Sequence, residues 1–383
     1  MSGSLNLIIK TTRKCNLRCS YCHDWRARGR PMDFEVLASL TAKALHHKNQ
    51  RVVNFIWHGG EPFLLGMDFF KKAMSLQERF LQPGQYVINS IQTNGTLLTP
   101  EWCDFLKRNK FTVGVSIDGP EKLHNQNRSY ASGLGSFQDI KKNIDMLKEY
   151  DIGFGILMVL NDNTKSLTPK EIFDFIVHDL GVNNFSFLPA VPDNIPGEAT
   201  GESQATDFFP MEDYADFMKG IFDYWFALDD PDVKIREIEG LMRSAMGGNP
   251  QVCTLAGNCI GENFHIEASG DVYHCDKYVG LAEYNLGNII EHDFQDIKES
   301  QKIQGLVALE ERRVTKLKQC SNFKMCNGGC PHDRFIADKY DKGFNGKCCG
   351  QFDLIEHIKV KISANVPVPL ENPVADTVVA ATL

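Results

Sequence analysis

The chain has 383 residues, 43% of them hydrophobic and 23% charged, which is enough for two or three domains with a substantial core. Its 41 basic and 49 acidic residues give a net charge of −8, which excludes the basic field that attracts nucleic acid or an anionic membrane surface. The N-terminus lacks a signal-peptide pattern, and no apolar run reaches the ~18 residues of a membrane-spanning helix. We therefore expect a cytoplasmic protein.

Strand-like and helix-like segments alternate over the first 190 residues. Thr99 and Thr168 each precede a proline and are expected to cap helices, and Glu171 completes a capping box with Thr168. Strands joined by helices form parallel βαβ units, which build either a partial (β/α) barrel or an open doubly wound sheet. The expected strands lie near 5–9, 52–57, 86–92, 111–116, 153–160 and 184–188, and the helices near 33–48, 67–82, 100–109, 136–150 and 168–180.

The second half of the chain differs from the first in composition and periodicity. A stretch rich in Pro, Gly and polar residues at 190–210 predicts a linker, and helical periodicity returns at 211–228 and 234–247. Residues 250–352 are cysteine-dense and short of long periodic segments, as expected where metal holds the fold. The tail after Ile362 is expected to be poorly ordered. The expected units are 1–195, 196–249, 250–355 and 356–383.

Twelve cysteines are the most informative feature of the composition. Cytoplasmic thiols are kept reduced, so the spacing of these residues points to metal ligands. Cys103 stands alone and is expected to pack inside a helix as a small hydrophobic side chain. The others form three groups: Cys15, Cys19 and Cys22; Cys253, Cys259 and Cys275; and Cys320, Cys326, Cys330, Cys348 and Cys349.

The first group has the spacing C-x3-C-x2-C and directly follows the first expected strand. It therefore lies at the C-terminal end of that strand, which is the face where (β/α) barrels carry their active sites. Three thiolates are one short of a closed site, so an Fe4S4 cluster held by them keeps one iron open to a small ligand. A structural zinc site completed by His23 is the alternative.

This motif resembles the signature of the radical SAM superfamily, and later segments extend the resemblance. Gly59-Gly60-Glu61-Pro62 resembles the motif that contacts the amino group of S-adenosylmethionine (SAM), where glycines allow close backbone approach and a carboxylate suits an ammonium. The segments 92–95 (QTNG) and 116–120 (SIDGP) resemble parts of the same pocket. The resemblance implies SAM contacts from Gly59, Gly60, Glu61, Asn94, Ser116, Arg128 and Tyr21.

Two of these assignments have an alternative. The resemblance implies that Ser116 and Arg128 hold the SAM carboxylate or ribose, and that Tyr21 packs beside the adenine. Arg128 is equally consistent with a surface salt bridge, and Tyr21 with simple packing.

The later cysteines resemble the SPASM extension of radical SAM enzymes that modify peptides and proteins. The resemblance covers residues 5–355 and implies a partial (β/α)6 barrel followed by this iron–sulfur extension. It implies one auxiliary Fe4S4 cluster that four thiolates close, which suits electron transfer, and a second cluster further along. Two structural zinc sites are the alternative. The implied ligands are Cys253, Cys259, Cys275 and Cys330 for the first cluster, and Cys320, Cys326, Cys348 and Cys349 for the second.

One position departs from the family pattern, because Leu317 stands where a cysteine is expected. Either Cys348 and Cys349 both ligate the second auxiliary cluster, or one iron has a non-thiolate ligand or stays open to substrate. Three Fe4S4 clusters would give about twelve iron atoms per chain.

The resemblance also implies a reaction. A reduced cluster cleaves SAM to a 5′-deoxyadenosyl radical, which abstracts a hydrogen atom from substrate carbon, and auxiliary clusters suit a net two-electron oxidation. The overall resemblance is closest to anaerobic sulfatase maturases, which oxidise Cys or Ser to formylglycine. Asp276 matches their catalytic base, although a carboxylate hydrogen-bonded near a cluster loop fits this position equally well.

Two mismatches favour a sister group over the sulfatase maturases: His23-Asp24-Trp25 replaces aromatic residues, and Leu317 replaces a thiolate. We therefore expect a maturase that installs thioether, ether or C–C cross-links in ribosomally made peptides. A sulfatase maturase is the first alternative and a small-molecule dehydrogenase the second. Asp24 then contacts a basic or polar substrate side chain, or is a solvated loop charge.

Two further proteins are expected as partners besides the peptide or protein substrate. A flavodoxin- or ferredoxin-type reductant supplies the electrons. Because only fourteen residues precede Cys15, recognition of a leader peptide falls to a separate protein or to the barrel itself.

Overall fold

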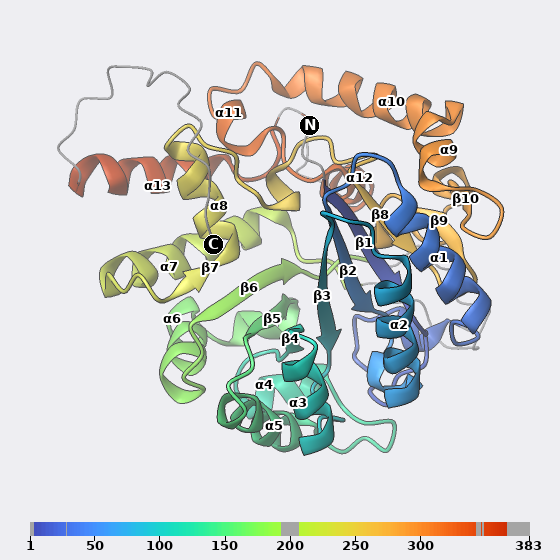
Figure 1. Ribbon diagram of the computed structural model, residues 1–383. Coiled ribbons are helices and arrows are strands. Elements are labelled where there is room, and N and C mark those ends of the chain that lie inside the picture. The colour runs from blue at the N-terminus through green and yellow to red at the C-terminus, as the bar shows by residue number, and fades with distance from the viewer. Residues whose placement is uncertain (1–3, 28, 193–206, 342–345, 347, 366–383) are drawn as a thin grey trace.

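The computed structural model describes residues 4–27, 29–192, 207–341, 346 and 348–365. Ten strands form one sheet in the order β10-β9-β8-β1-β2-β3-β4-β5-β6-β7 (Figure 1). The first six strands are parallel neighbours, which confirms the partial (β/α)6 barrel. Each lies within one residue of its expected limits: β1 Ser4–Lys10, β2 Val52–His58, β3 Tyr86–Thr93, β4 Thr112–Ser116, β5 Phe154–Leu160 and β6 Asn184–Pro189.

Helices connect these strands and cover the outside of the curved sheet (Figure 1). The Thr99 hydroxyl accepts a hydrogen bond from the Trp102 amide, and Thr168 and Glu171 form the expected reciprocal capping box. The helix at 168–180 is α-helical at first and ends in a π-turn, Phe175–Asp179. The connecting helices are α1 Phe34–His46, α2 Met67–Phe80, α3 Pro100–Arg108, α4 Glu121–Asn127, α5 Phe137–Glu149 and α6 Pro169–Asp174.

The C-terminal half adds strands to the same sheet, which the sequence did not predict. β8 (Asn263–Ile266) pairs in parallel with β1, and β9 (Asp271–Tyr273) and β10 (Gly287–Asn288) continue antiparallel from it. β7 (Lys234–Ile235) extends the other edge beside β6. Because β8 lies against β1, the loops that follow these two strands come together at one end of the sheet.

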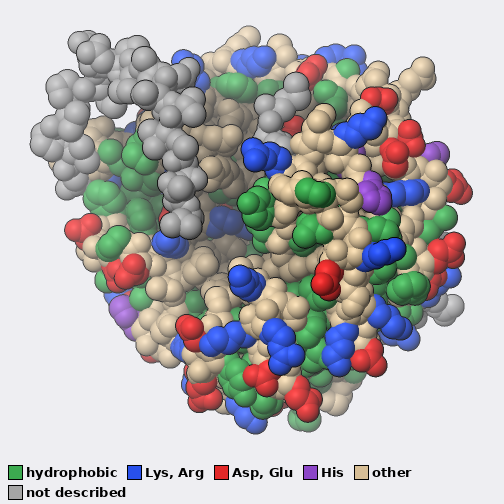
Figure 2. Space-filling model, in the orientation of Figure 1, with side chains coloured by type: hydrophobic (Ala, Val, Ile, Leu, Met, Phe, Trp, Pro, Cys, Tyr) green, Lys and Arg blue, Asp and Glu red, His purple; other side chains and the backbone are tan. Residues whose placement is uncertain are grey.

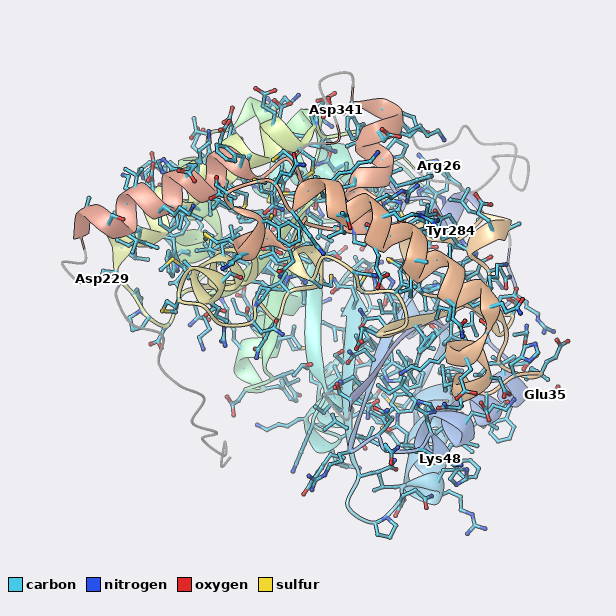
Figure 3. The ribbon with its side chains drawn as sticks, turned by 90° about the horizontal axis from the view of Figure 1, so that it is seen from above. Arg26, Glu35, Lys48, Asp229, Tyr284 and Asp341 are labelled. Atoms are coloured by element: carbon cyan, nitrogen blue, oxygen red, sulfur yellow. The ribbon has the colours of Figure 1, made fainter. Side chains whose placement is uncertain are left out.

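The expectation of no long helix within 250–352 is wrong, because α10 spans Gln301–Leu317. Its buried side chains, Ile303, Glu310 and Leu317, are seven residues apart and form one narrow stripe, so the apolar periodicity is weak. Helix α13 (Phe352–Asn365) crosses the expected boundary at 355/356. Seen from above, α10 and α13 run along the upper face (Figure 3). The tail from 366 onward and the linker at 193–206 lie outside the described residues.

The remaining helices are α7 (Met211–Leu228) and α8 (Arg236–Ala245), which agree with the expected helices at 211–228 and 234–247, and three short ones. Figure 2 shows basic and acidic side chains interspersed on the visible face. Within the described ranges, no helix has both the length and the apolar composition that a membrane span requires. The short helices are α9 Phe294–Glu299, α11 Phe323–Cys326 and α12 Pro331–Tyr340.

Candidate functional site

The first cysteine group lies on the loop that follows β1. Burial is the main reason that the pKa of the Cys15 thiol rises to about 12, and Cys22 adds to the shift because it lies nearby. Polar groups point at the sulfur atoms: the Leu17 amide lies 3.4 Å and Asn94 Nδ2 3.6 Å from Cys15 Sγ, and Arg128 Nη1 lies 3.8 Å from Cys19 Sγ. Donors placed in this way stabilise thiolates, so the loop suits an iron–sulfur cluster.

Gly59 and Gly60 let the loop after β2 lie directly on the cysteine loop. Gly60 N donates to Thr12 O at 2.7 Å, and Glu61 N donates to Lys14 O at 2.9 Å. Gly59 has φ +128°, and a Cβ on Gly60 would lie 2.3 Å from Lys14 O. The glycines are therefore needed for contact between two backbone segments of the protein itself.

Replacing Gly60 by alanine is expected to lower the free energy of unfolding by about 1–3 kcal/mol, because the new methyl group must displace backbone atoms. A urea titration followed by circular dichroism measures the change. Gly153→Ala is the matched control, since a Cβ at Gly153 meets nothing within 4 Å. Equal stability of the two variants would contradict the proposed packing.

Glu61 is fully buried beside the ends of β2 and β3. Its carboxylate accepts hydrogen bonds from Phe63 N at 3.1 Å, Asn94 N at 2.8 Å and Thr93 Oγ1 at 2.9 Å. Burial outweighs these bonds and raises its pKa to about 7. Among the described residues no cation forms a salt bridge with it, so a ligand ammonium fits this carboxylate.

Asp118 joins three of the pocket segments and is a residue that the sequence did not single out. Its Oδ2 lies 3.0 Å from Arg128 Nε and accepts a hydrogen bond from Tyr21 Oη at 2.6 Å, and its Oδ1 accepts one from Val159 N. Arg128 therefore does form a salt bridge, but a buried one (7% exposed) rather than one on the surface. Ser116 lies nearby and accepts a hydrogen bond from Gln92 Nε2 at 2.9 Å.

Asp24 is buried in an ion pair rather than solvated. Its Oδ1 lies 2.6 Å from Lys10 Nζ and 3.4 Å from Arg13 Nη1. Arg13 in turn donates to Glu267 at 2.6 Å, and Glu267 contacts His265 Nε2 at 2.7 Å. Burial opposes ionisation of Glu267, yet Lys10 and its other cationic neighbours lower its pKa to about 2. The network joins the cysteine loop to the end of β8. Its one signal in the sequence was Lys10, a lysine at the end of an apolar strand.

Asp276 lies where the loops after β1, β2 and β9 meet. Its Oδ1 is 3.4 Å from Cys275 Sγ. Burial alone would raise the pKa of Asp276, but the neighbouring His265, His58 and Lys10 side chains hold it well below the ordinary value. The carboxylate therefore stays charged beside Cys275, near Lys10 of β1 and His58 of β2.

The first auxiliary group comes together from three separate segments. Burial is the main reason that the pKa of the Cys275 thiol is raised, and the nearby Cys330 adds to the shift, while Cys253 is a neighbour of both Cys259 and Cys330. An ion pair of 2.8 Å between Lys277 and Asp333 joins the loop after β9 to the start of α12. The four thiols thus surround one region, as a closed cluster requires.

Contacts join only some of the cysteines of the second auxiliary group. The sulfur atoms of Cys326 and Cys349 are 3.3 Å apart, and Cys348 lies beside Cys349. Cys320 is half-buried in the turn after α10, and no sulfur contact joins it to the others within the described ranges. Nowhere in these ranges do three His, Cys, Asp or Glu side chains converge closely enough for a single metal ion. An Fe4S4 cluster is a larger body, so its ligands stand further apart.

Arg334 lies between the two auxiliary groups. Its guanidinium donates to Gly329 O at 2.8 Å and to Gly257 O at 3.4 Å, and it contacts Glu310 on α10. Gly257 belongs to the loop between Cys253 and Cys259. The buried ion pair therefore holds the loops of both groups in place.

Comparisons with known proteins match both halves of the chain. The radical SAM superfamily model matches residues 9–176, and the iron–sulfur cluster-binding SPASM model matches 253–331. The cysteine-type anaerobic sulfatase-maturating enzyme of Clostridium perfringens is 34% identical over 365 residues, covering 92% of this chain and 96% of the relative. The serine-type enzyme of Bacteroides thetaiotaomicron is 32% identical over 364 residues, covering 90% and 86%.

Solved structures agree with these relatives. Native anSMEcpe with bound AdoMet and Cp18Cys peptide superposes with a TM-score of 0.82 at 31% identity, covering 94% of this chain and 98% of the other. Streptococcus suis SuiB bound to precursor peptide SuiA has a TM-score of 0.61 at 16% identity, covering 88% and 73%. At that identity the likeness to SuiB concerns the fold alone.

The hypothesis that this chain cross-links ribosomally made peptides is therefore wrong. Relatives above 30% identity over nearly the whole chain are sulfatase-maturating enzymes, which was the first alternative. The mismatches at His23-Asp24-Trp25 and Leu317 do not outweigh this similarity, because they are four positions among 365 aligned residues.

Proposed function

Because the chain belongs to the family of the anaerobic sulfatase-maturating enzymes, within the radical SAM superfamily, we propose that it oxidises a cysteine or serine side chain of a peptide or protein to formylglycine. One observation supports this beyond the family: the Asp276 carboxylate lies against Cys275 and near Lys10, between the two cysteine regions. That is where a base for a substrate oxidised between the two sites is needed.

The enzyme uses SAM and [4Fe–4S] clusters, in keeping with its two domains. Bound together, SAM and the first cluster supply hydrogen-atom abstraction, and the auxiliary clusters accept an electron. We assign the open cluster to Cys15, Cys19 and Cys22, and the SAM ammonium to Glu61 with its partner Asn94. Ser116 and Arg128 are assigned to the SAM carboxylate or ribose, with Tyr21 held beside them by Asp118.

The oxidation removes two electrons and two protons from the substrate side chain. One hydrogen atom would leave through the radical chemistry that bound SAM supplies. An auxiliary cluster, which Cys253, Cys259, Cys275 and Cys330 would hold, would accept the second electron, and Asp276 would take the second proton. For a cysteine substrate the product is a thioaldehyde, and water then replaces sulfur, releasing hydrogen sulfide and leaving the aldehyde. His58 and His265 are neighbours of Asp276.

We also propose an external flavodoxin- or ferredoxin-type protein as the electron donor. Asp24 remains a candidate for substrate contact, but its ion pairs with Lys10 and Arg13 make it a positioning residue for the cysteine loop in this proposal. A separate leader-binding protein was needed only by the cross-linking hypothesis.

The buried Glu61 predicts an affinity for SAM that depends on pH. Below about pH 7 the carboxyl becomes protonated and loses its attraction for the ammonium, so SAM affinity is expected to fall about tenfold per pH unit. Above about pH 8 the SAM amino group, with an ordinary pKa of about 7.7–8.0, loses its own charge. Equilibrium dialysis of the cluster-loaded enzyme measures this optimum.

Glu61→Gln is expected to weaken SAM binding and to flatten the acidic side of the profile, since the amide does not titrate. Glu121→Gln, at an exposed position at the start of α4, is the control and should keep the wild-type profile. An acidic limb that persists in Glu61→Gln would show that another group titrates.

The function is tested by incubating the reconstituted enzyme anaerobically with SAM, a reductant and a synthetic peptide that carries the cysteine of a sulfatase modification site. Mass spectrometry is expected to show the loss of two hydrogens together with the replacement of sulfur by oxygen, and a hydrazide reagent should label the new aldehyde. The serine form of the peptide distinguishes the two substrate types. A product that has lost only two hydrogens and does not react with hydrazide would contradict the proposal.

A further inference from the structure

The second auxiliary group lacks the thiolate that the family pattern places at position 317. Leu317 ends α10 and is 2% exposed, and a methyl group on Gly328 would lie 3.1 Å from its Cδ1. The leucine side chain is thus part of the packed interior and offers no ligand atom. A cluster closed by four thiolates must take its remaining sulfur from elsewhere in the chain.

Cys349 brings a sulfur atom to the second auxiliary group. Its Sγ lies 3.3 Å from that of Cys326, and the two residues are only 8% and 3% exposed. Cys348 is the preceding residue, so three thiols from two distant segments come together. The sulfur atoms of Cys326 and Cys349 lie closer than two ligands of one cluster stand, so binding of the cluster must move them apart.

Two glycines determine where Cys349 lies. Gly329 has φ +73°, and a Cβ there would come within 2.9 Å of Cys349 Cβ. Gly350 has φ +86°, and a Cβ there would lie 2.6 Å from Cβ of Met211 on α7. The backbone on both sides of the contact is thus in a conformation that favours glycine, and it presses Cys349 against the turn that follows Cys326.

A backbone amide points at one sulfur atom of this group. The Gly328 amide lies 3.4 Å from Cys326 Sγ, and Arg334 holds that turn through the Gly329 carbonyl. Amide donors stabilise thiolates, which are the form that binds metal, so the surroundings suit ligands better than a buried spare thiol.

We propose that Cys349 is the fourth ligand of the second auxiliary cluster and substitutes for the thiolate missing at Leu317. Cys320, Cys326, Cys348 and Cys349 then close the cluster without an open iron. The turn at Gly350 allows two adjacent cysteines to reach the same cluster. This inference concerns iron ligation alone and holds whatever side chain the enzyme oxidises.

The test uses the full chain, reconstituted anaerobically with iron and sulfide. Cys349→Ala is expected to lower the iron content from about twelve to about eight atoms per chain and to remove one signal from the electron paramagnetic resonance spectrum of the reduced protein. Adding Leu317→Cys to that variant should restore both. Cys103→Ala, in the core of α3, is the control and should keep about twelve iron atoms.

An iron content that stays at about twelve in folded Cys349→Ala overturns the proposal, as does a disulfide between Cys326 and Cys349 in the loaded wild-type enzyme. If the variant does not fold, the wild-type chain is alkylated before and after iron chelation. Labelling of Cys349 together with Cys326 only after chelation supports ligation. Labelling of Cys326 without Cys349 overturns it, because Cys349 is the more exposed of the two. SAM cleavage at the first cluster is unaffected in either case, which separates this result from a failure of the proposed function.

Discussion

Replacing Cys15, Cys19 or Cys22 by alanine is expected to abolish formation of 5′-deoxyadenosine from SAM and to lower the iron content by about four atoms per chain. The three thiols lie on one loop after β1, with Asn94 and Arg128 pointing at two of them. A cluster that already leaves one iron open to SAM does not survive the loss of another ligand. Chromatography of the nucleoside products with dithionite as reductant measures the cleavage.

Cys103→Ala is the matched control for this experiment, because Cys103 is buried in α3 far from any other cysteine in the sequence. It should cleave SAM at the wild-type rate. Continued cleavage in all three single variants of the first group would show that the cluster is held by other residues.

The barrel was predictable because its signals are local. Each parallel strand is a short apolar or β-branched run between amphipathic helices, and Thr99 and Thr168 mark two helix starts through their own hydrogen bonds. The spacing of the first three cysteines is equally local, since one loop carries all of them. The segments that we assign to SAM were recognised for the same reason, because each follows the end of an expected strand.

The contacts between the two halves were not predictable, because they depend on pairing across the sequence. β8 joins the edge at β1, and that pairing brings Glu267 to Arg13, 254 residues away. Asp118 belongs to a motif that the sequence displays, but its bond to Tyr21 and its ion pair with Arg128 appear only when separate loops meet. The sequence did not predict helix α10, because only one narrow stripe of its side chains is buried.

The substrate class shows how a local mismatch can mislead. Leu317 suggested altered chemistry because a thiolate was missing at one position. In the folded chain the sulfur of Cys349 reaches Cys326 from another segment, and we propose that it replaces the thiolate missing at position 317. Asp276, the residue that we propose as the base, lies beside Cys275.

Replacing Asp276 by asparagine is expected to slow formylglycine formation about 10²–10⁴-fold, which is the usual contribution of a positioned general base. Asparagine keeps the size of the side chain but cannot take the proton that leaves the substrate. Cleavage of SAM should continue, because the first cysteine group is untouched, so 5′-deoxyadenosine accumulates without aldehyde. The ratio of these two products, measured in the same reaction by chromatography and hydrazide labelling, is the quantity that reports on Asp276.

Asp271→Asn is the control, because it changes the same functional group at the other end of β9. Asp271 contacts Ser269 and Asn288 there. It should leave the product ratio at one aldehyde per SAM cleaved. The iron content of Asp276→Asn must also equal that of the wild type, since Asp276 neighbours Cys275 and a lost auxiliary cluster would also block the second electron. A variant with full iron and an unchanged ratio would show that the proton leaves by another route, and His58 and His265, which flank Asp276, would be the next residues to replace.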